Sequence, residues 1–280
     1  MTFYFAGIDI GSTMTKAVIL EKGILASVIG PTGPEQRRLA HRVMEEALKR
    51  ASLPFSRLTF IVATGYGRLN VPFADKQFTE ITCHARGIVH LLPRARTIID
   101  IGGQDVKGIK VDATGKVVDF VMNDKCAAGS GRFIEVIAET LGVPLDQVGE
   151  LSLQSQNPAT ISNLCTIYAQ QEVAASLAEG VPLPDLLAGV HLSLADRIVR
   201  MVKRLKVEEA VIVTGGGAKN RGLLKVLSEL LGQKILVPEE PLLTGALGAA
   251  LLGRELVDKA LKNKTPLETK ERVFKEVEIL

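Results

Sequence analysis

Short apolar runs separated by turn residues mark the beginning of the chain. Residues 4–10, 17–20 and 24–29 are predominantly apolar, and polar or glycine-containing turns divide them. This pattern predicts three consecutive strands joined as a β-meander. Apolar runs of similar length predict further strands at 58–63, 106–111, 116–122, 210–214 and 234–237.

Apolar residues recur at helical spacing in the segments between these strands. Residues 34–51 place Leu39, Val43 and Ala47 on one face, which predicts an amphipathic helix. The charged segment 254–280 is predicted to be helical with a frayed end. Further helices are predicted at about 80–92, 126–141, 167–179, 183–205, 220–231 and 244–252, the last built from small residues that suit close packing.

One strand-and-turn unit occurs twice. Ile8-Asp9-Ile10-Gly11 returns as Ile99-Asp100-Ile101-Gly102, and at the same spacing Lys16 is matched by Lys107. A strand is predicted directly after each turn. Such a repeat implies two structurally similar halves. We therefore expect an N-terminal domain at 1–97 and a C-terminal domain at 98–280.

Both Asp-Ile-Gly turns have the composition of phosphate-binding loops. Glycine lets backbone approach a phosphate without a Cβ clash, and hydroxyl and ammonium groups add donors and positive charge. We expect Asp9 and Asp100 to hold Mg²⁺ through its waters, and Gln104 or Asp105 to orient an attacking water. Two β-turns with capping aspartates are the alternative. The recurrence disfavours it, because two facing loops can clamp one triphosphate between two domains.

A third glycine-rich stretch, Gly215-Gly216-Gly217, follows the predicted strand at 210–214. It is not a P-loop, because no Gly-Lys-Ser/Thr follows it. Its place after the two phosphate loops predicts a contact with adenosine. The residues expected to bind ATP or ADP are Gly11, Ser12, Thr13, Lys16, Gly102, Gly103, Gly129, Gly131, Gly215, Gly216, Gly217 and Lys219.

Two cysteines stand where a helix is predicted to begin. Cys126 follows the strand at 116–122, and Cys165 precedes the helix at 167–179. Free N–H groups at a helix start favour a thiolate, a phosphate or an anionic cluster. The alternative is that both cysteines are small buried hydrophobic residues. For Cys83 and for His84, packing inside a helix of the first domain is the favoured interpretation, and Lys125 and Arg132 either tune a cluster's charge or are solvated.

Composition excludes several classes of protein. Of the 280 residues, 46% are hydrophobic, the net charge is +3 and no basic run occurs, which argues against a nucleic-acid partner. Three cysteines form no disulfide framework and suggest a reducing compartment. No uncharged apolar run is long enough for a membrane span, and the first residues enter a strand, so we expect no signal peptide and a cytoplasmic protein.

These motifs carry a resemblance to a known family. The order of the two Asp-Ile-Gly loops and Thr214-Gly-Gly-Gly resembles the acetate/sugar kinase, Hsp70 and actin superfamily. Within it, the stretches around Cys126 and Cys165, together with Ile81-Thr-Cys-His-Ala-Arg-Gly, closely resemble the ATP-dependent activators of 2-hydroxyacyl-CoA dehydratases, as far as about Gly253. The resemblance implies an α/β fold with two ribonuclease-H-like domains around a nucleotide cleft. It also implies a homodimer with one 4Fe–4S cluster, to which each chain contributes two cysteines.

The cysteine count agrees with a shared cluster. A cubane cluster usually takes four thiolates, and motifs such as C-x₂-C-x₂-C supply most of them within one chain. This chain has two candidates, Cys126 and Cys165, and no CxxC motif. A two-fold dimer makes two ligands into four.

The resulting hypothesis is an ATPase redox activator. Reduced by ferredoxin or flavodoxin, the dimer would pass one electron to a partner 2-hydroxyacyl-CoA dehydratase as it hydrolyses ATP. A small-molecule kinase of the same superfamily, a metal-free nucleotide switch and an ATPase subunit of a benzoyl-CoA reductase-like enzyme, which would pair with a paralogous chain, are the alternatives.

Overall fold

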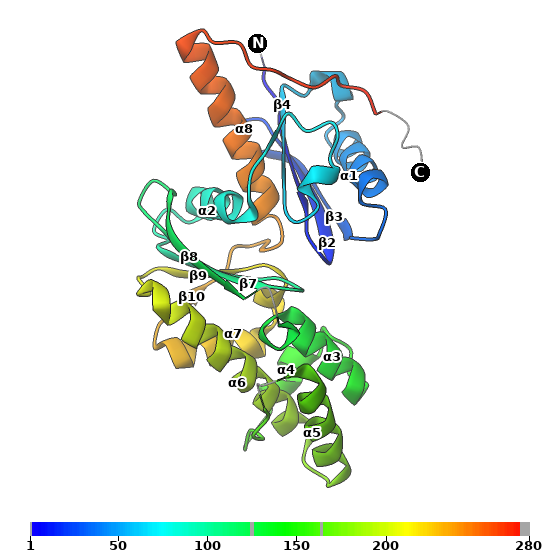
Figure 1. The fold of residues 1–280 in the computed structure, drawn as a ribbon, viewed down its shortest axis with the longest axis vertical. Helices are drawn as coiled ribbons and strands as arrows, with labels where there is room; N and C mark the ends of the chain where they lie inside the picture. Colours follow the sequence, from blue (N-terminus) through cyan, green and yellow to red (C-terminus); the bar gives the residue numbers. More distant parts are fainter. Residues whose placement is uncertain (1, 124–125, 163–164, 275–280) are drawn as a thin grey trace. The chain divides into compact units, whose positions relative to one another are not determined.

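A computed structural model describes residues 2–123, 126–162 and 165–274 (Figure 1). The chain folds into two compact units. Unit 1 contains the described parts of Met1–Pro93, Thr114–Lys116 and Leu242–Leu280, and unit 2 contains those of Arg94–Ala113 and Val117–Pro241. None of the helices in these ranges has both the length and the hydropathy needed to cross a membrane.

Unit 1 is built on a five-stranded mixed sheet with the order β3-β2-β1-β4-β5. The predicted β-meander is confirmed: β1, β2 and β3 pair antiparallel in sequence, whereas β4 joins β1 in parallel. The strands are β1 (Phe5–Ile10), β2 (Met14–Leu20), β3 (Ile24–Pro31), β4 (Phe60–Thr64) and β5 (Lys76–Gln77).

Both faces of this sheet are covered by helices. Alternate side chains of a strand point to opposite faces, and β1 has apolar side chains on both. Ile8 and Ile10 of β1 pack with α1 (Gln36–Arg50). Phe5 of β1 packs on the other face with α8 (Thr244–Asn263), beside α2 (Glu80–Leu91) (Figure 1). The predicted close packing of the small-residue helix is confirmed.

Unit 2 repeats the same sheet topology, with the order β10-β9-β6-β7-β8. Its helices lie on one side of the sheet in Figure 1. Apolar residues of β6 and β9 form the core of unit 2 with them. The strands are β6 (Thr97–Ile101), β7 (Val106–Val111), β8 (Val117–Asn123), β9 (Val211–Thr214) and β10 (Ile235–Leu236), and the α-helices are α3 (Gly131–Leu141), α4 (Val148–Ser152), α5 (Thr166–Ala178), α6 (Leu183–Val202) and α7 (Arg221–Leu231).

The grouping of residues differs from the expected division at 97/98. Helix α8 packs in unit 1 and not in the second half of the chain, because its small residues allow close contact with α2 and β1. A Cβ on Gly248 would overlap the carbonyl oxygen of Cys83. The hydrophobic pattern of the sequence does not indicate that α8 packs in unit 1.

The predicted helix at 254–280 ends early. Helix α8 stops at Asn263, and Lys264 adopts a left-handed conformation with φ +53°. The described residues after it run along unit 1 without helix. There a guanidinium nitrogen of Arg272 lies 2.7 Å from Asp75 Oδ2, and the Phe274 ring stacks on Phe55 with centroids 4.2 Å apart. These contacts outweigh the weak helical pattern of the tail.

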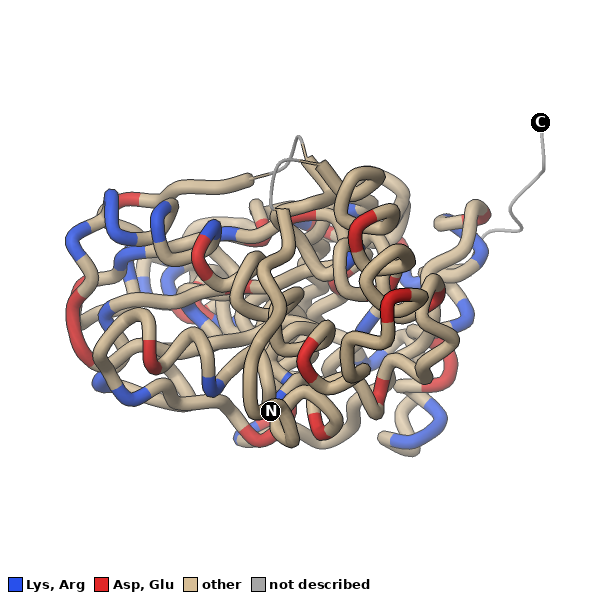
Figure 2. Tube along the Cα trace, turned by 90° about the horizontal axis from the view of Figure 1, so that it is seen from below, with Lys and Arg blue, Asp and Glu red and all other residues tan. Residues whose placement is uncertain are grey.

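Charged positions are mixed over the molecule. Blue lysine and arginine segments alternate with red aspartate and glutamate segments throughout the described chain (Figure 2). Such interspersion keeps single-sign fields small. It agrees with the net charge of +3.

A buried histidine in unit 2 makes stability depend on pH. His191 of α6 is fully buried, with Nε2 2.9 Å from the side-chain nitrogen of Asn220, which caps α7. Burial lowers the pKa of His191 to about 4. An unfolded histidine takes up a proton near pH 6.5, so stability is complete above that pH and is lost as the pH falls toward 4.

We therefore expect His191→Gln to flatten the pH dependence of unfolding. Wild-type protein should lose about 2 kcal/mol of unfolding free energy from this group between pH 7.5 and pH 5, and the variant should lose little of it. Urea titrations followed by circular dichroism at both pH values measure the difference. His90→Gln, at an exposed position of α2, is the matched control and should keep most of the wild-type slope.

Candidate functional site

The two Asp-Ile-Gly loops have matching structures in the two units. Across β1 and β2, Asp9 lies opposite Lys16, and across β6 and β7, Asp100 lies opposite Lys107. Lys16 Nζ is 3.1 Å from Asp9 Oδ2, and Lys107 Nζ is 3.6 Å from Asp100 Oδ2. The register of each hairpin therefore brings the repeated lysine back to the repeated aspartate.

Both turns also close in the same way. The Gly11 N–H donates to the Met14 carbonyl at 3.1 Å, and the Gly102 N–H donates to the Asp105 carbonyl at 2.9 Å. A Cβ on Gly102 would lie 2.8 Å from Asp105 Oδ1, so a larger residue would force this turn apart. Ser12 and Thr13 lie at the tip of the first turn, and Gly103 and Gln104 at the tip of the second. The tips thus carry hydroxyl and amide side chains, with glycine at Gly103.

The two candidates for orienting a water have different surroundings. Asp105 is buried and its carboxylate lies 2.5 Å from Lys107 Nζ, so the lysine holds it in place. Gln104 is exposed. Of the two side chains, the amide of Gln104 is the one with freedom to meet a water.

The glycine run after β9 has a counterpart in unit 1 that the sequence analysis did not single out. Gly215 has φ +79°, and a Cβ on it would lie 2.6 Å from Asp100 Oδ1. In unit 1, Gly65 follows β4 with φ +84° and crowds Asp9 Oδ1 in the same way. The sequence does contain a sign that the two loops are equivalent, because Thr64-Gly-Tyr-Gly parallels Thr214-Gly-Gly-Gly.

The remaining glycines and Lys219 occupy varied positions. Gly216 has open space around its Cα, whereas a Cβ on Gly217 would overlap Ile101. Lys219 is exposed and lies 3.1 Å from Glu240 Oε1. Gly129 packs against the Asn123 side chain, and Gly131 against the Gly102 carbonyl oxygen. The structure thus gives Gly129 and Gly131 close contacts within the chain itself.

The two cysteines are free thiols in unit 2, and each is partly exposed. Cys165 is the N-cap of α5, as expected. Helix α3, however, begins at Gly131 and not at Cys126, because a 3₁₀ turn of Ala127–Gly129 comes between them. Four neighbours within the two cysteine motifs, Asp124, Lys125, Asn163 and Leu164, lie outside the described residues.

Cys83 has a different environment. It is fully buried on α2, and burial raises the pKa of its thiol to about 12. Such a thiol stays protonated at neutral pH, whereas metal ligation takes the thiolate. Cys126 and Cys165 therefore suit an iron–sulfur cluster, and Cys83 does not. In the described ranges, no three Cys, His, Asp or Glu side chains are arranged to hold a metal ion within one chain.

Hydrogen bonds join the second Asp-Ile-Gly loop to the turn after Cys126. The Gly131 N–H donates to the Gly102 carbonyl at 2.9 Å, and the Arg132 N–H donates to the Gly103 carbonyl at 2.8 Å. The buried Ser130 hydroxyl lies 3.1 Å from the Gly103 carbonyl oxygen and 3.0 Å from that of Ala127. The start of α3 is thus attached directly to the loop that follows Asp100. The Arg132 side chain is exposed and pairs with Glu135.

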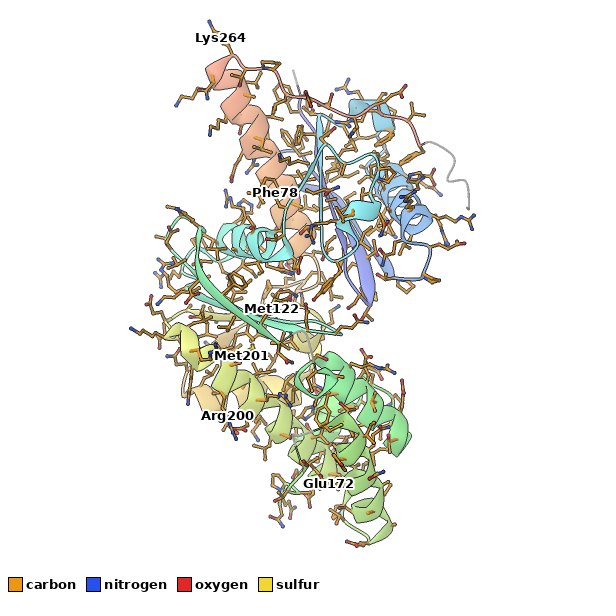
Figure 3. The ribbon with its side chains drawn as sticks, viewed as in Figure 1. Phe78, Met122, Glu172, Arg200, Met201 and Lys264 are labelled. Atoms are coloured by element: carbon orange, nitrogen blue, oxygen red, sulfur yellow. The ribbon has the colours of Figure 1, made fainter. Side chains whose placement is uncertain are left out.

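The segment at Cys165 is held from within α5. The Ser162 N–H donates to a carboxylate oxygen of Glu172 at 2.7 Å, and Figure 3 shows Glu172 on this helix. Directly after the cysteine, Ile167 and Tyr168 are 64% and 62% exposed. Both are among the most exposed large apolar side chains of the described residues.

Comparison with known proteins identifies the family. Residues 6–253 match the BadF/BadG/BcrA/BcrD ATPase family. The 2-hydroxyisocaproyl-CoA dehydratase activator of Clostridioides difficile is 44% identical over 89% of this chain and 94% of its own length. The activator of lactoyl-CoA dehydratase of Anaerotignum propionicum is 45% identical over 91% and 99%.

Solved structures agree with this result. A structure of the activator of the 2-hydroxyisocaproyl-CoA dehydratase from Clostridium difficile with bound ADPNP has a TM-score of 0.88 at 41% identity, covering 95% of this chain and 100% of that chain. The expected α/β fold with two domains of the actin and Hsp70 type is confirmed. The chain belongs to the BadF/BadG/BcrA/BcrD ATPase family and is similar to activators of 2-hydroxyacyl-CoA dehydratases.

Proposed function

We propose that this protein hydrolyses ATP to drive the transfer of one low-potential electron to a 2-hydroxyacyl-CoA dehydratase. The observation that carries the proposal is the direct attachment of the second phosphate loop to the turn after Cys126, through the Gly131 and Arg132 N–H groups. A change in the loop on nucleotide binding or hydrolysis would move the cysteine with it. The similarity to dehydratase activators points to the same function.

Each chain would supply Cys126 and Cys165 to one 4Fe–4S cluster shared by two copies. The fit rests on two partly exposed thiols, of which Cys165 caps α5, where free N–H groups stabilise an anionic group. When bound, the cluster supplies a one-electron carrier. Ile167 and Tyr168 beside Cys165 would be covered by the second copy of the chain.

The nucleotide-binding residues would have distinct roles. Asp9 and Asp100 would hold Mg²⁺, since both are carboxylates fixed beside a lysine. The backbone of the two glycine loops binds the phosphates, and the stretch Gly215-Gly216-Gly217 contacts adenosine. Gln104 orients the attacking water, because Asp105 is held by Lys107.

ATP would serve to convert a weak reductant into a strong one. A change of about 200 mV in a one-electron potential corresponds to on the order of 5 kcal/mol. Nucleotide binding and hydrolysis can supply this only if they favour one conformation over the other. The hydrogen bonds of Ser130, Gly131 and Arg132 to the loop are the link through which this preference would reach the cysteine.

The reaction needs two protein partners. A ferredoxin or flavodoxin would reduce the activator, and the dehydratase would receive the electron and carry out the radical chemistry on the acyl-CoA. The three free cysteines suit a reducing cytoplasm, where we place the reaction.

The decisive experiment measures iron, sulfide and oligomer size after anaerobic purification. We expect about two iron atoms per chain in a dimer, which corresponds to one cubane bridging two copies. About four per chain would contradict the bridging geometry. Colourless protein, even after reconstitution, would favour a small-molecule kinase if ATP turnover needs an acceptor, or a nucleotide switch if it does not. Iron found only with a paralogous chain would favour a benzoyl-CoA reductase-like subunit.

A further inference from the structure

A buried histidine of unit 1 is held in a fixed orientation near the first phosphate loop. His84 of α2 is 6% exposed, and its Nδ1 lies 2.8 Å from Oγ1 of Thr244, the first residue of α8. The two helices approach closely at Gly87 and Gly248, where a Cβ would overlap backbone of the other helix. This packing leaves the ring little freedom.

The other ring nitrogen borders the same small space as the Asp9 carboxylate. A Cβ placed on Gly245 would lie 3.0 Å from Asp9 Oδ2 and 3.2 Å from His84 Nε2, so both atoms border the same small space. Groups arranged in this way can interact directly or through one water. Lys16 Nζ reaches the same carboxylate oxygen at 3.1 Å. The Asp9 carboxylate thus has the lysine in contact with one oxygen and the histidine across the small space above Gly245.

We propose that His84 is a positioning residue for ATP hydrolysis: through Nε2 it orients the Asp9 carboxylate, and Thr244 orients the imidazole. This proposal rests on the proposed role of Asp9 in holding Mg²⁺. A carboxylate that binds a metal through water depends on the partners that fix its direction, and loss of such a partner typically costs about 10- to 100-fold in metal affinity or activity. Gly245 contributes by leaving room for the two side chains to converge.

The competing explanation is that His84 only packs α2 against α8. The two explanations differ in what a substitution changes. Loss of packing lowers the thermal stability of unit 1 and leaves the magnesium requirement of the folded protein as it was. Loss of positioning changes the magnesium requirement or kcat, even where the melting temperature is retained.

The test compares His84→Ala with His84→Gln, whose amide can reach the position of Nε2. We expect His84→Ala to raise the Mg²⁺ concentration for half-maximal ATPase activity, or to lower kcat, by about 10- to 100-fold, and His84→Gln to recover much of this loss. Thr244→Val should show a smaller change in the same direction, and Thr244→Ser almost none. His90→Gln, the exposed histidine of the same helix, should match wild type.

Wild-type magnesium dependence and kcat in both His84 variants would overturn the proposal, as would a lowered melting temperature alone. If wild-type protein binds ATP without hydrolysing it, the proposed function fails separately. The Mg-ATP dissociation constants of the same variants, measured by calorimetry, then decide the role of His84. Equal values for His84→Ala and wild type would exclude it.

Discussion

Replacing Cys126 with alanine should give colourless protein that still binds ATP. The variant removes one of two thiolates in each chain, and a bridging cubane would lose two of its four ligands. Nucleotide binding should stay nearly unchanged, because the bonds from this turn to the phosphate loop use backbone groups and Ser130 and do not involve the Cys126 thiol. Iron analysis and the ATP dissociation constant of the anaerobic protein measure the two effects.

Cys83→Ala is the matched control. It makes the same chemical change at a fully buried thiol whose pKa is raised to about 12, so it should keep full iron and the wild-type spectrum. Cys165→Ala should behave like Cys126→Ala. A Cys126→Ala protein that retains a stoichiometric cluster would contradict the assignment of this cysteine as a ligand.

Asp100→Asn should lower the kcat of ATP hydrolysis by at least about 100-fold while the iron content stays the same. The substitution keeps the size of a buried side chain next to Gly215 but removes the negative charge that would hold Mg²⁺ and that now faces Lys107. Lys107 keeps Asp105 as a partner, which limits the cost to folding. Steady-state phosphate release at saturating Mg-ATP gives the rate.

The control for this change is Asp119→Asn, at an exposed position of β8 in the same unit. It should hydrolyse ATP at the wild-type rate. A wild-type rate in Asp100→Asn would remove the second loop from the catalytic machinery and leave Asp9 as the candidate for holding Mg²⁺. A melting temperature measured for both variants separates loss of function from loss of fold.

The local sequence pattern was sufficient to predict the structure where segments that are neighbours in the chain pair with one another. The β-meander of unit 1 follows from apolar runs divided by short turns, and the repeated Asp–Lys spacing predicts that unit 2 has the same hairpin. A hairpin's register depends on its turn length, which the sequence contains directly. Cys165 was also placed correctly at the start of α5, because a helix start depends on residues that are close in the sequence.

The boundaries of helices and the conformations of loops were less predictable from the sequence. Helix α3 begins at Gly131, after a 3₁₀ turn, because Ser130, Gly131 and Arg132 bond to the loop after Asp100. The equivalence of the loops at Gly65 and Gly215 lies in conformation, namely a positive φ beside a buried aspartate. Residue type alone reports such a conformation weakly, because glycine also occurs where no positive φ is needed.

The sequence by itself determined the family, the two repeated sheets and the candidate chemistry, because these depend on residue type and on contacts between neighbouring segments. Only the tertiary structure decided that α8 returns to unit 1, that Thr244 meets His84 near Asp9, and that the turn after Cys126 bonds to the second Asp-Ile-Gly loop. These contacts join segments far apart in the chain. They arise from close helix packing and from the need to satisfy buried backbone groups, and no periodicity in the sequence records either.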